Sequence, residues 1–142
     1  METEPKIIEA YIVPGKVKLV YRHLLQLGDG SVRTAEASEC AADQGAFWPM
    51  HNTLYARQNE VYAGADLDAT LVGFAKDLRL DTAAFADCMQ SHKHLAAVQA
   101  DYQAAQAAGV QFRPVFDIND VRVSGALPLS TFQKQIDAAL AK

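Results

Sequence analysis

The sequence predicts an α/β domain in which a block of helices separates one early strand from a late β-hairpin. Apolar residues at helical spacing dominate the middle of the chain, from about residue 32 to residue 109. Short β-type runs lie before that block, at 16–24, and after it, at 114–125. The chain has 142 residues, half of them apolar, which suits one domain with a core of its own.

A short helix and then a strand are expected at the start of the chain. Residues 5–13 carry apolar side chains at helical spacing, and a proline–glycine pair follows that run. In residues 16–24, Val17, Leu19 and Tyr21 alternate with other residues. The alternation predicts a mostly buried strand.

The middle of the chain predicts a run of helices with recognisable ends. Ser31 can cap the first helix, Asp66 or Asp68 can begin the third, and Asp81 can begin the fourth. Gly109 is placed to end the last one. The expected helices cover residues 32–45, 47–58, 67–80, 81–90 and 92–109.

The pattern changes again near the end of the chain. Residues 114–125 contain two β-type runs around an Asn-Asp turn, which predicts a hairpin. Ser130 can cap a closing helix whose apolar residues, Phe132, Ile136 and Leu140, are spaced to face inward.

The composition of the chain argues against nucleic acid as a partner and against a membrane-spanning helix. The formal net charge is −4 and no cluster of lysine and arginine appears, so nucleic acid is not expected as a partner. No apolar run approaches the roughly 18 residues that a membrane helix needs. Residues 1–5 lack the basic and apolar segments of a secretory signal, which predicts either a cytosolic chain or one whose true beginning is missing. No cofactor is expected.

Cys40 and Cys88 allow three interpretations from the residues alone. Both lie late in predicted helices and beside acidic residues, an environment that raises a thiol pKa and disfavours a nucleophile. Cys88 and His92 stand four residues apart, so with Cys40 and His94 they could hold zinc, although two close Cys/His pairs are missing. They could also be two buried thiols that pack as small hydrophobic groups.

The aromatic residues beside the first cysteine are expected to be structural. Phe47 and Trp48 lie in a predicted amphipathic helix, where a single tryptophan is usually part of the core. His51 is expected to be a hydrogen-bonded packing residue rather than a metal ligand.

A strand, a helical block, a hairpin and a closing helix, in that order, make up the second half of a thioredoxin fold. Four stretches carry a more specific pattern: GKVKLVYRHL, AEASECAADQGAFWPMHNTLYARQ, LRLDTAAFADCM and GVQFRPVFDIND. Through them the chain resembles the DsbA-like thioredoxin-fold oxidoreductases, in the bacterial branch with a helical insert, over essentially its whole length. The resemblance implies a truncated thioredoxin-like fold with an inserted α-helical subdomain, as a single domain over 1–142 with the insert at about 31–108.

The chain departs from the family at the active site. In that family the first strand is followed by Cys-x-x-Cys, which performs disulfide exchange. Here the two cysteines are 48 positions apart, and Met1 would correspond to a point inside the family's first helix. The resemblance therefore implies a protein of the disulfide-bond-forming family that is inactive as given, with a non-catalytic peptide- or protein-binding module as the alternative.

The resemblance also assigns roles to four residues. It implies that Cys40 and Cys88 pair as a structural disulfide in the insert, which would fit an oxidising, extracytoplasmic compartment. It implies that Pro114 is a cis-proline that, with Arg113, borders the groove for extended protein or peptide substrates. The alternative is a trans proline at the first residue of a strand.

A homodimer is the remaining expectation. Without the family's first strand, residues 16–24 and 114–119 lack their shared neighbour, and unpaired backbone groups are costly when buried. Either these two segments pair with each other, or two chains join at their exposed edges.

Overall fold

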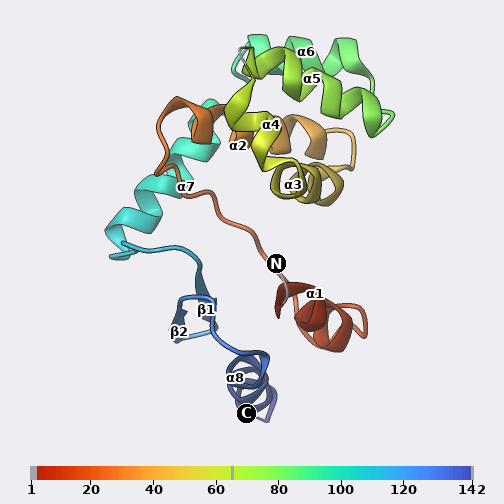
Figure 1. Cartoon of the computed structure of the whole chain (residues 1–142). Coiled ribbons are helices and arrows are strands. Elements are labelled where there is room, and N and C mark those ends of the chain that lie inside the picture. Colours follow the sequence, from red (N-terminus) through yellow and green to blue (C-terminus); the bar gives the residue numbers. More distant parts are fainter. Residues whose placement is uncertain (1–2, 65, 142) are drawn as a thin grey trace. The chain divides into compact units, whose positions relative to one another are not determined.

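The computed structural model describes residues 3–64 and 66–141 and divides them into two compact units. One unit combines the described residues of 1–21 with those of 106–142, and the other contains residues 22–105. Figure 1 shows both units with their elements labelled. None of the helices in the described ranges is long and apolar enough to cross a membrane.

The first unit brings the start and the end of the chain together around a hairpin. Val115 lies opposite Ser124 in the antiparallel pair, and the connecting turn places Asn119 at φ 51°, a left-handed conformation that asparagine tolerates. The predicted hairpin and closing helix are confirmed. The elements of this unit are α1 (Thr3–Ile7), the π-helical turn η1 (Ile8–Ile12), β1 (Val115–Ile118), β2 (Val121–Ser124) and α8 (Leu129–Leu140).

A small apolar core joins these elements. The rings of Phe116 and Phe132 meet edge to face with centroids 4.8 Å apart, and Ile136 is buried beside them. The Tyr11 hydroxyl donates a hydrogen bond of 2.9 Å to a carboxylate oxygen of Asp137, which ties the first turns of the chain to α8. The closing helix begins at Leu129, directly after Pro128, so Ser130 lies inside the helix rather than at its cap. Leu140, expected to face inward, is 48% exposed.

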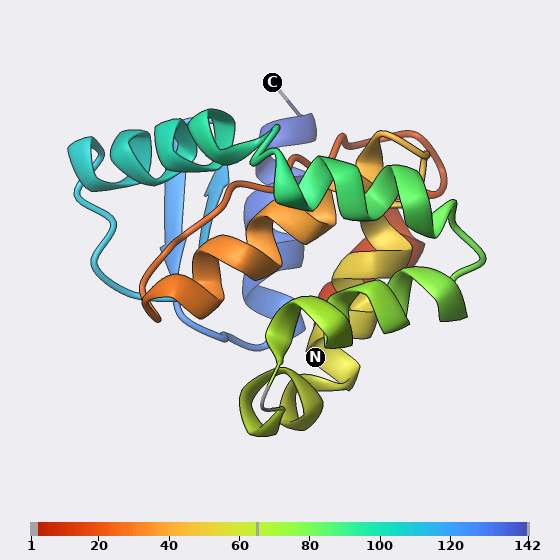
Figure 2. The ribbon, with the colours of Figure 1, turned by 90° about the horizontal axis from the view of Figure 1, so that it is seen from above.

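The second unit is a helical bundle centred on α2 (Figure 2). Helix α2 packs against α3, α5 and α6, and its Ala37 and Ala41 are fully buried at that contact. Small side chains let helices approach closely, and the larger Met50, Leu71 and Phe74 fill the space around them. The helices are α2 (Asp29–Ala42), α3 (Phe47–Ala56), α4 (Gln58–Ala63), α5 (Leu67–Asp77), α6 (Thr82–Gln90) and α7 (Leu95–Ala107).

Several helix ends follow the expected capping chemistry. The Asp66 side chain accepts a hydrogen bond of 3.0 Å from the Ala69 amide at the start of α5. Asp81 accepts two such bonds at the start of α6. Gly109, at φ 71°, follows α7 as predicted.

Other helix boundaries differ from the prediction. Helix α2 starts three residues earlier than expected, and the Ser31 hydroxyl accepts from the Leu27 amide instead of capping the helix. The helix expected over 47–58 ends at Ala56, and α4 follows it after Arg57. Helix α7 begins at Leu95 rather than at residue 92, because His92 adopts a left-handed conformation with φ 51° that interrupts a helix.

The strand expected at residues 16–24 was wrong. Residues 18–26 have no regular secondary structure, although Val17, Leu19 and Tyr21 are half-buried and Val20 is exposed. The alternation therefore predicted how the side chains divide between exposed and sheltered positions, but a strand also needs a hydrogen-bonded neighbour. Among the described residues β1 pairs only with β2, so direct pairing of 16–24 with the hairpin, one of the two alternatives, does not form there.

Candidate functional site

The Arg113–Pro114 turn leads into β1 in the first unit, and the peptide bond between these residues is cis. The Pro114 carbonyl accepts a hydrogen bond of 2.8 Å from the Gly125 amide, which extends the pairing of the hairpin by one step. Phe112, just before the turn, is 68% exposed. The role of Arg113 and Pro114 in binding a substrate stays a prediction.

The hydrogen-bonding alternation of the hairpin fixes which backbone groups face outward. In a two-residue hairpin the residues that flank the turn bond to each other, and every second pair along the ladder does the same. Ile118 and Val121 flank the turn, and the bond between Gly125 and Pro114 agrees with that alternation. The N–H and C=O groups of Val115 and Asp117 therefore point away from β2, toward the outer edge of β1.

A cross-strand ion pair stiffens the hairpin. The Arg122 guanidinium donates to both carboxylate oxygens of Asp117, at 2.8 and 3.0 Å, and to the Ala108 carbonyl at 2.6 Å. The hydrogen bond from Arg122 lowers the pKa of the Asp117 carboxyl, and the same pair raises the pKa of Arg122. The pair holds β1 and β2 together without using the outer edge of β1.

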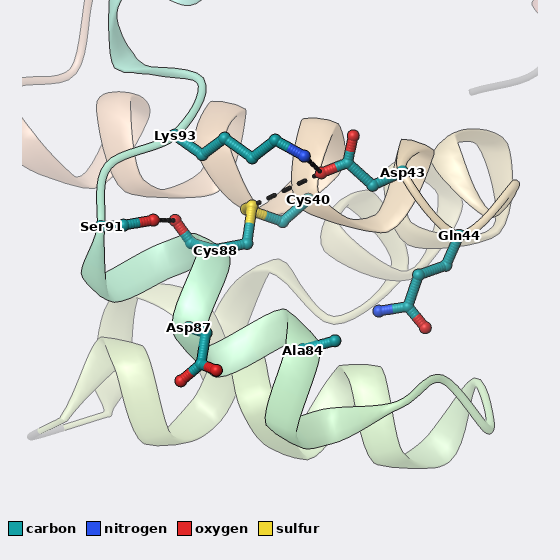
Figure 3. A pocket seen from close by; sticks show the side chains of 8 residues that line it. All are labelled: Cys40, Asp43, Gln44, Ala84, Asp87, Cys88, Ser91 and Lys93. Carbon is teal, nitrogen blue, oxygen red and sulfur yellow. Dashed lines mark hydrogen bonds and ion pairs between the residues drawn. A yellow bond between two sulfur atoms is a disulfide. The ribbon is translucent and has the colours of Figure 1, made fainter.

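A disulfide joins Cys40 on α2 to Cys88 on α6 in the second unit. The two Cα atoms lie 5.9 Å apart, within the usual range for such a bond. A pocket of about 460 Å³ opens beside it (Figure 3). Its lining consists of Cys40, Asp43, Gln44, Ala84, Asp87, Cys88, Ser91 and Lys93.

Charged groups gather on one side of this disulfide. The Lys93 ammonium lies 2.8 Å and the His94 Nε2 atom 2.9 Å from the same carboxylate oxygen of Asp43. Hydrogen bonds, first from Lys93 and then from His94, lower the pKa of the Asp43 carboxyl. That oxygen is also 3.8 Å from the Cys88 sulfur. Figure 3 shows Lys93 and Asp43 meeting above the disulfide while Asp87 points away from it.

The structure brings together three of the four residues weighed as zinc ligands. The two sulfurs and a ring nitrogen of His94 all lie within 4.8 Å of one another. His92 is not part of this group, because its Nδ1 atom lies 3.0 Å from a carboxylate oxygen of Glu36. In the disulfide form neither sulfur is a thiolate, the state in which cysteine binds zinc.

A buried charge network near the start of α2 was missed by sequence reasoning. The Glu36 side chain is 1% exposed and accepts a hydrogen bond of 3.0 Å from Arg33. Arg33 also donates to both carboxylate oxygens of Asp68, at 2.9 Å each, and to the Met89 carbonyl at 3.1 Å. The signal was a glutamate between two alanines of an apolar face, three residues after an arginine.

The aromatic residues of α3 form a chain of ring contacts. His51 is buried and pairs with Asn52 at 3.1 Å, which confirms it as a hydrogen-bonded packing residue. Its ring lies 5.3 Å from the Trp48 ring and 4.8 Å from the Tyr55 ring, centroid to centroid. The core position expected for Trp48 was wrong, since this side chain is 36% exposed and borders the buried His51 and the half-buried Phe47.

A family model shows the family of this chain, and two solved structures share its fold. The family model described as "Thioredoxin" matches residues 1–138. In solved structures, BdbD from Bacillus subtilis in its oxidised form has a TM-score of 0.85 at 21% identity over 99% of this chain and 78% of its own. A thioredoxin-like oxidoreductase from Silicibacter pomeroyi has a TM-score of 0.78 at 24% identity, over 99% of this chain and 76% of its own.

The curated relatives are much longer than this chain, which matches only a part of each. The Na⁺/H⁺ antiporters NhaA 3 of Salinispora tropica and NhaA 1 of Salinispora arenicola are each 30% identical over 142 residues. This chain spans 21% of their length, or about a fifth. The two structural neighbours support a DsbA-like thioredoxin fold, and the family model over residues 1–138 shows the family: the chain belongs to the thioredoxin family.

Proposed function

We propose that this chain is a polypeptide-binding module of the thiol–disulfide oxidoreductase lineage, and that it holds extended protein segments along the outer edge of β1. The observation that carries the proposal is the outward orientation of the Val115 and Asp117 backbone groups beside the Arg113–Pro114 turn. An extended segment can add to such an edge as a further strand, with affinity from main-chain hydrogen bonds.

The side chains around this edge suit a segment of mixed character. Phe112 and Val121 are exposed at 68% and 41% and offer apolar contacts near the two ends of the strand. The paired charges of Asp117 and Arg122 lie between them and already satisfy each other. We expect main-chain pairing to dominate and sequence preference to be weak.

Disulfide exchange of the Cys-x-x-Cys type is not part of the proposal for these 142 residues. In that chemistry a thiolate attacks a disulfide and a mixed disulfide forms, which a nearby second thiol then resolves. The two cysteines here are 48 positions apart and bonded to each other. In a dithiothreitol-driven insulin reduction assay, we expect the chain to give the uncatalysed rate. A clear acceleration would overturn this part of the proposal.

Binding can be tested with a proline placed on either edge of the hairpin. The probe is fluorescein-labelled ribonuclease A, reduced and carboxamidomethylated so that it is unfolded and has no thiol, and the readout is fluorescence anisotropy. Val115→Pro removes an outward N–H from β1, and Ser124→Pro, directly opposite, does the same on β2. We expect Val115→Pro to weaken binding by tenfold or more, and Ser124→Pro to leave it unchanged. Equal effects of the two variants would contradict an assignment to the edge of β1.

The same edge also supports pairing of two copies of the chain. Two outer edges of β1 could join as neighbouring strands, which would make a homodimer. Light scattering would then give twice the chain mass of 15.4 kDa, and the unfolded ribonuclease would lower it by competing for the edge. A mass of one chain at all micromolar concentrations would contradict the dimer and leave polypeptide binding to its own test.

A second candidate function is that of an accessory domain in an ion antiporter. It is favoured by the 30% identity to two Na⁺/H⁺ antiporters over 142 residues. The intact mass of the natural protein in its source cells tests this candidate. A mass several times larger, in the membrane fraction, is expected if the candidate is correct, and a mass of 15.4 kDa would contradict it.

A further inference from the structure

We propose that the Cys40–Cys88 pair becomes a zinc site when the disulfide is reduced, with Cys40, Cys88, His94 and Asp43 as the four ligands. This inference concerns the second unit alone and does not depend on the binding function proposed for the hairpin. It rests on the convergence of two sulfurs, an imidazole nitrogen and a carboxylate oxygen at one point.

The donor atoms are already close to the spacing that zinc requires. The two sulfurs and the His94 nitrogen lie within 4.8 Å of one another, and the Asp43 oxygen is 2.9 Å from His94 and 3.8 Å from the Cys88 sulfur. Tetrahedral zinc with Zn–S bonds of about 2.3 Å holds its two sulfurs about 3.8 Å apart. Opening the S–S bond therefore requires only a small side-chain rotation at each cysteine.

The chemical step balances with a dithiol as the reductant. The dithiol gives two electrons and two protons to the S–S bond and becomes a disulfide, while Cys40 and Cys88 become thiols. Zn²⁺ then binds both sulfurs as thiolates and releases the two protons. The set of two thiolates, one imidazole and one carboxylate consists of donors that zinc prefers.

The surroundings favour an ion at this position. Two thiolates and a carboxylate leave one excess negative charge around Zn²⁺, and the Lys93 ammonium lies 2.8 Å from the Asp43 oxygen to offset it. The pocket beside the disulfide gives a path for a dithiol and for the ion. The ligands come from well-packed elements, since Cys40 is buried in α2 and Cys88 in α6, next to Ala41 and Phe85 of the same core.

His92 provides a matched control in the same segment. It stands two residues before His94, but its ring is held at 3.0 Å by Glu36, away from the sulfurs. If the reduced chain unfolded and bound zinc non-specifically, loss of His92 or of His94 would weaken zinc binding equally. If zinc binds at a folded site, only the loss of His94 weakens it.

The test measures zinc on the whole chain in both redox states. The protein is reduced anaerobically with tris(2-carboxyethyl)phosphine, mixed with zinc sulfate, desalted and analysed by plasma mass spectrometry. We expect one zinc per reduced chain and none per oxidised chain. His94→Ala should lower the affinity at least tenfold, and His92→Ala should leave it unchanged. Cobalt in place of zinc should give the thiolate charge-transfer and intense visible bands of a tetrahedral site.

Three results would overturn the inference. These are no zinc on the reduced wild-type chain, equal losses in His94→Ala and His92→Ala, or loss of helical circular dichroism in the zinc-loaded reduced protein. Asp43→Asn tests the fourth ligand. A tenfold or larger loss supports the carboxylate as a ligand, and an unchanged affinity removes it from the set.

Discussion

Replacing Arg33 by methionine should be among the most destabilising single changes in the second unit. The Arg33 guanidinium is the hydrogen-bond donor to Glu36, whose side chain is 1% exposed, and it also contacts the Met89 carbonyl. Methionine keeps the length and the apolar stem of the side chain, so the change removes the charge and leaves little empty space. Among the partners that the structure describes for Glu36, the contact with His92 would then remain.

The expected loss follows from the burial of Glu36. Removing one partner of a buried ion pair costs about 3–5 kcal/mol, because a charge is left without compensation. The other arm of Arg33 reaches Asp68, which is 59% exposed, and an exposed pair is worth less than about 1 kcal/mol. Asp68→Asn is thus the matched control. The double variant Arg33→Met with Glu36→Met should recover most of the loss, since an apolar pair of similar volume can replace a buried ion pair.

Urea unfolding followed by the fluorescence of Trp48 measures this loss. Trp48 is the only tryptophan and lies in α3, so its signal reports on the second unit. The free energy of unfolding and its urea dependence are compared among the four proteins. A loss for Arg33→Met no greater than that of Asp68→Asn would refute the reasoning, as would a double variant no more stable than Arg33→Met.

Three further predictions concern the disulfide and two titrating groups. Replacing Cys40 and Cys88 by alanine removes a disulfide between positions 48 residues apart and should lower the free energy of unfolding by up to about 4 kcal/mol, measured with urea. A decrease of less than about 1 kcal/mol would contradict this. Hydrogen bonds from Lys93 and His94 lower the pKa of the Asp43 carboxyl in the folded protein. The stability that ionised Asp43 gives the fold is therefore complete above about pH 4, the pKa of an aspartate in the unfolded chain, and is lost as the pH falls through the lower pKa of the folded protein. Asp43→Asn should therefore lower the melting temperature at pH 7 and match the wild type in strong acid, and a gap that persists in acid is the contrary result. Burial and a hydrogen bond to a carboxylate raise the pKa of Tyr11, so Tyr11→Phe should be less stable at pH 7, and calorimetry should show the gap closing above about pH 10.

The parts of the fold that depend on local chemistry could be predicted from the sequence. Asp66 and Asp81 cap their helices as expected because a carboxylate beside free amides needs no distant partner. The hairpin turned at the predicted Asn-Asp pair for the same reason. The segment at 16–24 failed because alternation sets side-chain direction, whereas a strand depends on a neighbour from elsewhere in the chain.

The chemistry of the second unit was harder to predict because its groups meet only after folding. Arg33 and Glu36 are three residues apart, but Met89, which completes their contacts, is more than fifty residues away. Asp43 and His94 are separated by 51 positions, and no spacing rule links them. The same limit explains why the core position predicted for Trp48 was wrong. Helical periodicity placed Trp48 on an apolar face, but the packing of the bundle decides how much of that face is buried.

The two units differ in when their residues leave the ribosome. Residues 22–105 are contiguous, so every partner in that unit, including both cysteines, is synthesised before the hairpin exists. The other unit needs both ends of the chain, and the bond from Tyr11 to Asp137 joins positions 126 residues apart. During translation the helical unit can therefore fold first, while the apolar side chains of α1 and η1 stay exposed until α8 has been synthesised. Nascent-chain proteolysis should consequently detect protection of residues 22–105 before protection of residues 3–12.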